Sequence, residues 1–280
     1  MKVILADYSG FCFGVEKAIN TTFEELEKKQ VKDNISSLGP LIHNNQVVKD
    51  LEEKGVKVFE DINDISTGSV IVRSHGVSEE IYEIAKDKGL NIIDATCPFV
   101  RRIQNIAKKY HDKGYTIAII GNPKHPEVIG INGWCNNEAI IIKDEENLKQ
   151  IPKFDKLCVV AQTTMSVDQY EKIIEQLENY ANEIVKFNTI CSATKERQLA
   201  AKNLAEKVEA MIVIGGYHSS NTQKLVSICE EIKPDATYHV ETVEDLPLKD
   251  IKQYKIVGVT AGASTPKWII NEIIHKLSNI

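Results

Sequence analysis

The 280-residue chain lacks the local motifs that identify several common classes of enzyme. It contains neither the G-x-x-x-x-G-K-[ST] loop of P-loop nucleotide-binding proteins nor the G-x-G-x-x-G turn of dinucleotide-binding domains. No C-x-x-C pair occurs either, which argues against zinc ribbons and thioredoxin-like redox sites. Nucleotide-binding and zinc-ribbon interpretations therefore lose their usual support.

Long hydrophobic runs and an excess of positive charge are also missing. The apolar stretch Val3 to Ala6 is broken by Asp7 and is too short for the apolar core of a secretory signal. No segment approaches the roughly 18 apolar residues of a membrane span. The 34 basic residues are outnumbered by 40 acidic ones, which argues mildly against a surface that coats nucleic acid. We expect a cytoplasmic protein that binds neither membranes nor nucleic acid.

What the chain does contain is a regular alternation of two patterns. Short apolar runs rich in Val and Ile end in small or polar residues, and each is followed by a segment with apolar residues at i, i+3 and i+4. This alternation predicts α/β structure with mostly parallel sheets. Capping residues predict helix starts at Ser78, at Ser166, and at Ser264 or Thr265 before Pro266.

Three of the six cysteines occupy the same place in this alternation, at the end of an apolar strand and just before a helix. Cys12, Cys97 and Cys191 lie in VILADYSGFCFGVEKAI, LNIIDATCPFVRRIQNI and VKFNTICSATKERQLAA. Their spacing predicts a threefold internal repeat. We expect three similar lobes around a centre, with residues 14–97 in the first, 98–191 in the second, and 192–280 with 1–13 in the third.

Polar side chains end two further strands after each of these cysteines. Because ligands bind at the carboxyl ends of parallel strands, the three sets predict one shared central cavity. The sets are His43 and His75; His125 with Gln162, Thr163 and Thr164; and Ser219, Ser220 and Asn221 with Ser264.

Three thiolates around one point can hold a metal cluster and leave one coordination position free. Iron–sulfur clusters commonly take four cysteines in tighter motifs, so the repeat rather than any local spacing supports this interpretation. The remaining cysteines, Cys135, Cys158 and Cys229, have no equivalents in the repeat, and we interpret them as buried residues that only pack the core. Cys135 is expected at a strand edge, Cys158 inside a strand and Cys229 on the inner face of a helix.

Two further features suit chemistry on a phosphorylated small molecule. Ser219, Ser220, Asn221 and Ser264 lie beside glycines at helix starts, where hydroxyl groups, amides and the helix dipole attract a phosphate or diphosphate. The same residues would also serve as simple N-caps. Glu127 follows His125 by two residues, and burial near a cluster cavity would allow its carboxyl to stay protonated as a proton donor. A glutamate at a helix start also simply favours the helix dipole.

Two other functions remain open on the residues alone. An iron–sulfur sensor would explain the three cysteines but not the histidine, serine and asparagine set. A zinc hydrolase would use cysteine and histidine ligands. A basic surface or a DNA-reading helix would favour the sensor, and the sequence shows neither. Metal analysis separates the other two classes, because bound iron favours a cluster enzyme and a single zinc favours a hydrolase.

The sequence as a whole resembles the 4-hydroxy-3-methylbut-2-enyl diphosphate reductase family, which completes the methylerythritol phosphate route to isoprenoid precursors. The resemblance runs from end to end and rests on many separate blocks in order. They are GFCFGVEKAI, GPLIHN, RSHG, DATCP, GNPKHPEV, QTTMS, NTICSATKERQ, HSSNT and TAGASTP.

The resemblance implies a pseudo-threefold α/β fold around one 4Fe-4S cluster, held by Cys12, Cys97 and Cys191. It implies that Glu127 delivers protons and that Thr163, or Thr164 beside it, orients the substrate hydroxyl. The residues that it assigns to the substrate diphosphate are His43, His75, His125, Ser219, Ser220, Asn221 and Ser264.

The implied reaction is the reductive dehydroxylation of (E)-4-hydroxy-3-methylbut-2-enyl diphosphate with two electrons and two protons. The products are isopentenyl diphosphate and dimethylallyl diphosphate, and a ferredoxin or flavodoxin is the implied electron donor. Some relatives carry an RNA-binding extension, which we do not expect here because the chain ends soon after the third lobe.

Overall fold

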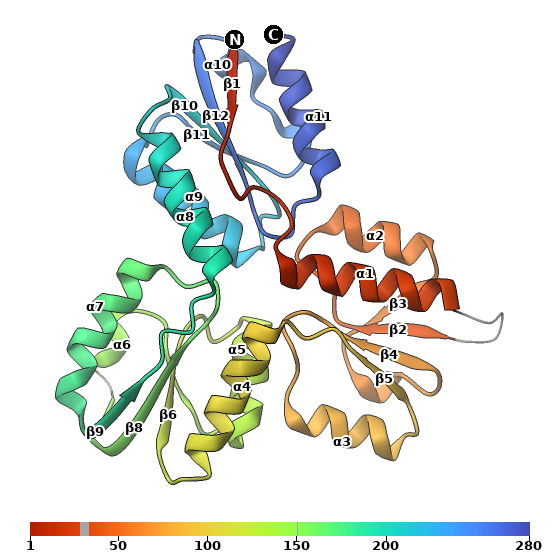
Figure 1. The fold of residues 1–280 in the computed structure, drawn as a ribbon, viewed down its shortest axis with the longest axis vertical. Coiled ribbons are helices and arrows are strands. Elements are labelled where there is room, and N and C mark those ends of the chain that lie inside the picture. Colours follow the sequence, from red (N-terminus) through yellow and green to blue (C-terminus); the bar gives the residue numbers. More distant parts are fainter. Residues whose placement is uncertain (29–33, 150) are drawn as a thin grey trace. The chain divides into compact units, whose positions relative to one another are not determined.

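The computed structural model describes residues 1–28, 34–149 and 151–280 (Figure 1). The chain divides into two compact units. The first unit comprises Met1–Glu16, Ile42–Lys49 and Ser192–Ile280, and the second comprises Lys17–Leu41 and Asp50–Cys191. The first unit holds one sheet, called sheet A, and the second holds sheets B and C.

Each sheet has four parallel strands joined in the same order. Sheet A reads β1-β12-β10-β11, sheet B reads β5-β4-β2-β3 and sheet C reads β9-β8-β6-β7. The predicted parallel α/β fold with three similar lobes is therefore confirmed. The strands are β1 (Lys2–Leu5), β2 (Ile35–Leu38), β3 (Val56–Phe59), β4 (Ser69–Val72), β5 (Asn91–Asp94), β6 (Thr116–Ile120), β7 (Ile140–Ile142), β8 (Phe154–Ala161), β9 (Ala181–Lys186), β10 (Ala210–Ile214), β11 (Thr237–Val240) and β12 (Ile256–Ala261).

Helices connect the strands, as parallel pairing requires. The α-helices are α1 (Phe13–Lys28), α2 (Asn45–Glu53), α3 (Glu79–Asp87), α4 (Pro98–His111), α5 (Pro126–Asn132), α6 (Glu145–Leu148), α7 (Val167–Leu177), α8 (Ser192–Ala205), α9 (Ser220–Ile232), α10 (Leu248–Ile251) and α11 (Lys267–Ser278). Short 3-10 turns are η1 (Ile62–Asp64), η2 (Gly133–Cys135), η3 (Glu178–Tyr180) and η4 (Val243–Asp245). None of the helices in the described ranges is long and apolar enough to cross a membrane.

The inner strands are buried on both faces, which explains why their sequences read as continuous apolar runs. In β6, Ile117 and Ile119 pack with α4 and α5, whereas Ala118 and Ile120 pack with α7. Sheet A repeats this arrangement, with α8 and α9 packed on one face and α11 on the other (Figure 1). Successive residues of a strand thus pack into two separate hydrophobic cores, one on each face of the sheet, and helices cover both faces.

Two of the three predicted helix starts are confirmed. Ser78 is the N-cap residue of α3, and Ser166 caps α7 by accepting a hydrogen bond from the backbone of Gln169. The third prediction is wrong, because α11 begins at Lys267 and Pro266 occupies the N-cap position. Ser264 instead donates its hydroxyl to the backbone oxygen of His43, 3.0 Å away.

Candidate active site

The three repeated cysteines each stand immediately before a helix. Cys12 precedes α1, Cys97 is the N-cap residue of α4, and Cys191 precedes α8. A short loop separates each cysteine from the strand before it. The prediction that each cysteine lies at the end of its strand is therefore wrong. All three side chains are half-buried, and none of the six cysteines, which all lie in described ranges, forms a disulfide.

The backbone of each cysteine is held by the same type of hydrogen bond. The cysteine N–H donates to a carbonyl in the loop that follows the neighbouring strand of its own sheet. The pairs are Cys12 to Ala263 (3.1 Å), Cys97 to Ser74 (3.0 Å) and Cys191 to Thr163 (3.2 Å). Three sheets therefore present their cysteines in one backbone setting, next to loops that carry other predicted site residues.

The other three cysteines are fully enclosed. Burial raises the pKa of Cys135, Cys158 and Cys229 to about 12, so these thiols stay protonated. Cys158 lies inside β8 and Cys229 on the buried side of α9, as predicted. Cys135 ends the 3-10 turn η2 rather than lying at a strand edge, because Gly133 and Trp134 continue the turn of α5.

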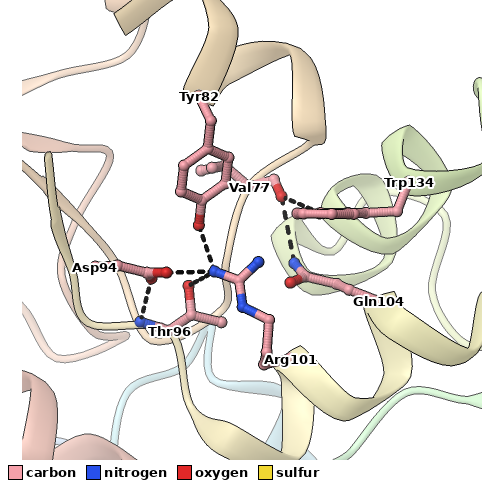
Figure 2. A network of polar contacts seen from close by, with 7 residues as sticks. All are labelled: Val77, Tyr82, Asp94, Thr96, Arg101, Gln104 and Trp134. Carbon is pink, nitrogen blue, oxygen red and sulfur yellow. Dashed lines mark hydrogen bonds and ion pairs between the residues drawn. The ribbon is translucent and has the colours of Figure 1, made fainter. Parts of the chain in front are cut away.

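A polar network fixes the loop that leads to Cys97 (Figure 2). Arg101 forms an ion pair with Asp94 and donates to the hydroxyl of Tyr82 at 2.6 Å. Asp94 in turn accepts from the backbone of Thr96 at 3.0 Å. Burial alone would raise the pKa of Asp94, but the hydrogen bonds from Thr96 and the charge of Arg101 outweigh it and lower that pKa. The carboxylate therefore stays ionised and anchors the loop.

The same arginine lies over two aromatic rings. Its guanidinium carbon is 5.3 Å from the ring centre of Tyr82 and 5.2 Å from that of Trp134. Trp134 donates its indole N–H to the carbonyl of Val77 at 2.9 Å, and Gln104 donates to the same oxygen at 3.2 Å (Figure 2). Sequence reasoning missed Arg101, although an arginine one turn after a cysteine at a helix start was a usable signal.

Glu127 is buried beside Thr163. The backbone N–H of Thr163 donates to Oε1 and its hydroxyl donates to Oε2, both at 2.6 Å. Burial raises the pKa of Glu127 to about 7, although the two hydrogen bonds from Thr163 act to lower it. The carboxyl therefore changes its protonation state near neutral pH, as a general acid must.

The two predicted histidines of the second unit lie close together. The rings of His75 and His125 meet edge to face, with 5.4 Å between their centres. His125 is the N-cap residue of α5, and its Nδ1 accepts from the backbone N–H of Glu127 at 3.2 Å. That hydrogen bond makes Nδ1 the acceptor, so in a neutral ring Nε2 carries the N–H.

The remaining predicted residues converge within the first unit. Ser219 caps α9, with Ser220 and Asn221 in the first turn. Asn221 accepts from the backbone of Ala263 at 3.1 Å, next to Ser264. Its amide nitrogen Nδ2 is buried and has no hydrogen-bond partner among the described residues. A buried donor left unpaired at a helix N-terminus suits an anion.

Close backbone approach in the first unit requires a glycine at 216. A Cβ added to Gly216 would lie 2.7 Å from the carbonyl oxygen of His43. Because the hydroxyl of Ser264 donates to that same oxygen, His43, Gly216 and Ser264 form one tightly packed group. The structure thus brings His43, Asn221 and Ser264 into one neighbourhood of this unit.

Two further residues that sequence reasoning missed hold the cysteine loops. The guanidinium of Arg197, on α8, donates to the backbone oxygen of Gly10 at 2.7 Å, just before Cys12. Thr189, just before Cys191, accepts from the N–H of Ala161 at 2.7 Å and donates to its carbonyl at 2.6 Å. Arg197 is only 3% exposed, and a buried arginine carries a sequence signal only when its burial is already known.

The chain is similar to known proteins along its whole length. A family model described as LytB protein matches residues 3–278. A relative from Alkaliphilus oremlandii, named 4-hydroxy-3-methylbut-2-enyl diphosphate reductase, is 58% identical over 280 residues, with 100% of both chains covered. A relative of the same name from Clostridioides difficile is 51% identical, again with 100% of both chains covered.

Two solved structures that the chain resembles are also described as diphosphate reductases. One, described as (E)-4-hydroxy-3-methyl-but-2-enyl diphosphate reductase, the terminal enzyme of the non-mevalonate pathway, has a TM-score of 0.71 at 36% identity and full coverage of both chains. Another, E-1-hydroxy-2-methyl-but-2-enyl-4-diphosphate reductase from Plasmodium falciparum, has a TM-score of 0.91 at 32% identity, covering 99% of this chain and 88% of its own. The chain therefore belongs to the LytB protein family.

Proposed function

We propose that this protein is a 4-hydroxy-3-methylbut-2-enyl diphosphate reductase. It reduces (E)-4-hydroxy-3-methylbut-2-enyl diphosphate with two electrons and two protons, breaks the C–O bond to the hydroxyl group and releases water. The products are isopentenyl diphosphate and dimethylallyl diphosphate. The observation that carries this proposal is the full-length match, at 58% identity, to a relative that bears the enzyme's name.

The proposed cofactor is one 4Fe-4S cluster held by Cys12, Cys97 and Cys191. The donor set fits, because these thiols are half-buried at helix starts and share one backbone setting, whereas the other thiols are enclosed. A helix N-terminus also stabilises a thiolate, which is the form that binds metal. When bound, the cluster supplies electrons and an iron atom that polarises the substrate hydroxyl.

The protein's own part in the chemistry centres on Glu127. With a pKa of about 7, its buried carboxyl can be protonated at neutral pH and give that proton to the leaving hydroxyl. Thr163 holds both carboxyl oxygens, so the proton is delivered from a fixed position. Thr164 instead accepts from the side chain of Gln162 at 2.7 Å, which favours Thr163 as the residue that orients the substrate hydroxyl.

The diphosphate is bound by histidines, neutral or protonated, and by hydroxyl and amide donors, rather than by a lysine cluster. The N-terminus of α9 offers backbone N–H groups, and the unpaired Nδ2 of Asn221 adds a side-chain donor. Binding energy taken from the diphosphate, remote from the reacting carbon, holds the hydroxyl in place for reaction. The residues assigned to this task are His43, His75, His125, Ser219, Ser220, Asn221 and Ser264.

The proposal extends to the setting of the enzyme. Its electron donor is a ferredoxin or flavodoxin, and it works in the cytoplasm. The equivalent strand orders of sheets A, B and C support lobes that comprise residues 14–97, residues 98–191, and residues 192–280 with 1–13.

The decisive test is anaerobic turnover. Purified protein is incubated with (E)-4-hydroxy-3-methylbut-2-enyl diphosphate and dithionite-reduced methyl viologen, and the products are identified by mass spectrometry. We expect isopentenyl and dimethylallyl diphosphates together with oxidation of the viologen. Iron-loaded protein that leaves the substrate unchanged would contradict the proposal, as would a colourless, iron-free preparation that is fully active.

A further inference from the structure

Helix α4 carries an unusual charge pattern for an acidic protein. The chain as a whole has a net charge of −6. Among the α-helices in the described ranges, α4 is the one that contains basic residues and no Asp or Glu. Its cations are Arg101, Arg102, Lys108 and Lys109. The helix therefore forms a local positive stripe, and the partial positive charge of its N-terminus adds to it.

Two of these four cations form ion pairs and two do not. Arg101 forms an ion pair with Asp94, and Lys108 forms one with Glu79. Arg102 and Lys109 are exposed and have no ion pair within the part of the chain that the structure describes. Their charges are thus available to an acidic partner.

These two cations line an open groove of about 360 Å³ along the outer side of α4. The opposite side of the helix packs Ile103 and Ala107 into the core. The groove is lined by Pro98, Arg101, Arg102, Asn105, Ile106 and Lys109. It therefore combines apolar side chains with cations, as transient protein interfaces do.

The groove begins beside a proposed cluster ligand. Pro98 lines it and directly follows Cys97, the N-cap residue of α4. Phe99, in the same first turn, is 38% exposed although its ring is large and apolar. An exposed aromatic side chain beside cations is typical of the contact residues in an interface.

We propose that this groove, called the α4 groove, docks an acidic one-electron carrier protein that feeds the cluster. This inference rests on the proposed function, which requires two electrons in each turnover. Two reduced carriers each lose one electron, and the substrate gains both electrons with two protons as its C–O bond breaks and water leaves. Charge attraction steers the carrier to the groove, and electron-transfer complexes in general bury little surface, which lets the oxidised carrier depart.

The test compares two double variants with the same change in net charge. Arg102→Glu with Lys109→Glu reverses the two unpaired charges of the groove. The matched control is Lys153→Glu with Lys172→Glu, two exposed lysines outside α4 that also lack ion pairs among the described residues. Turnover is measured once with a purified acidic bacterial ferredoxin and once with methyl viologen, and binding of the ferredoxin is measured directly.

We expect the groove variant to raise the KM for ferredoxin by about tenfold or more and to weaken its binding equally, while turnover with viologen is unchanged. The control should retain the wild-type KM, and added salt should raise that KM because it screens exposed charges. Equal effects in both variants, or an unchanged KM in the groove variant, would overturn the proposal.

Self-association of the protein that the groove variant abolishes would also overturn it, because a second copy would then occupy the groove. Failure of wild-type turnover with viologen would contradict the proposed function instead. The direct binding measurement tests the α4 groove in either case.

Discussion

Glu127 and Thr163 form a two-point contact in which both carboxyl oxygens accept hydrogen bonds from one residue, each 2.6 Å long. The contact holds an acid that burial has made weaker, with a pKa of about 7. Removing the carboxyl from water favours its protonated form, whereas the hydrogen bonds favour the ionised form. The balance leaves a proton available near neutral pH.

Replacing Glu127 with Gln should abolish most of the turnover without disturbing the fold. The amide keeps the shape of the side chain but has no proton to give, so we expect the rate with viologen to fall by roughly 10²-fold or more. Iron content and substrate binding should stay at wild-type levels. A variant that works at nearly the normal rate would show that another group supplies the proton.

The same carboxyl should make stability depend on pH. Between pH 4.5 and about 7 the folded state keeps the proton on Glu127 and the unfolded state loses it, so the free energy of unfolding falls as pH rises. The total loss is roughly 3 kcal/mol over that range. Thermal midpoints of wild type and Glu127→Gln are compared anaerobically from pH 5 to 8. As the pH rises, the midpoint of the wild type should fall relative to that of the variant. A constant difference between them would contradict the raised pKa.

Two substitutions at Thr163 separate its hydroxyl group from its size. Thr163→Val removes the hydrogen bond to Oε2, and because this bond lowers the pKa of Glu127, that pKa should rise further. The alkaline limb of the pH profile of kcat should then move to higher pH. Thr163→Ser keeps the hydroxyl and serves as the control. Identical pH profiles of kcat for Thr163→Val and wild type would show that the hydroxyl of Thr163 does not affect the pKa of Glu127.

Cysteine variants test the division of the six thiols. Replacing Cys12, Cys97 or Cys191 with Ser should remove most of the bound iron, because each substitution deletes one thiolate ligand. The matched substitutions at the enclosed positions, Cys158→Ser and Cys229→Ser, should keep the iron while lowering thermal stability. Iron loss in an enclosed variant, or full iron in a ligand variant, would mean that the cysteines are wrongly assigned.

The architecture was predictable because its signals are local. Alternation of apolar runs with helical periodicity marks each strand and helix, and the three cysteine segments show the repeat without any knowledge of pairing. The grouping of residues 1–13 with residues 192–280 was also expected, but the hydrogen-bonded pairing of β1 with β12 has no local signal in either segment.

The side-chain contacts within the candidate site were not predictable from the sequence, because they depend on the register in which the strands pair. Ile120 at the end of β6 pairs with Ala161 at the end of β8, and this register places the loops that follow them side by side. Glu127 and Thr163 meet for that reason, although 36 residues separate them. The wrong prediction for Ser264 has a similar cause, because its hydroxyl bonds to the backbone of His43, 221 positions earlier in the chain, instead of capping a helix.

The proposed reaction requires a cluster that is held by three thiolates and open to substrate at one iron. Iron-57 Mössbauer spectroscopy of anaerobically purified protein, recorded with and without (E)-4-hydroxy-3-methylbut-2-enyl diphosphate, tests this directly. We predict about four iron atoms per chain, with the signal of one iron site altered by the substrate. A spectrum that the substrate leaves unchanged, or active protein that contains zinc and no iron, would contradict the account.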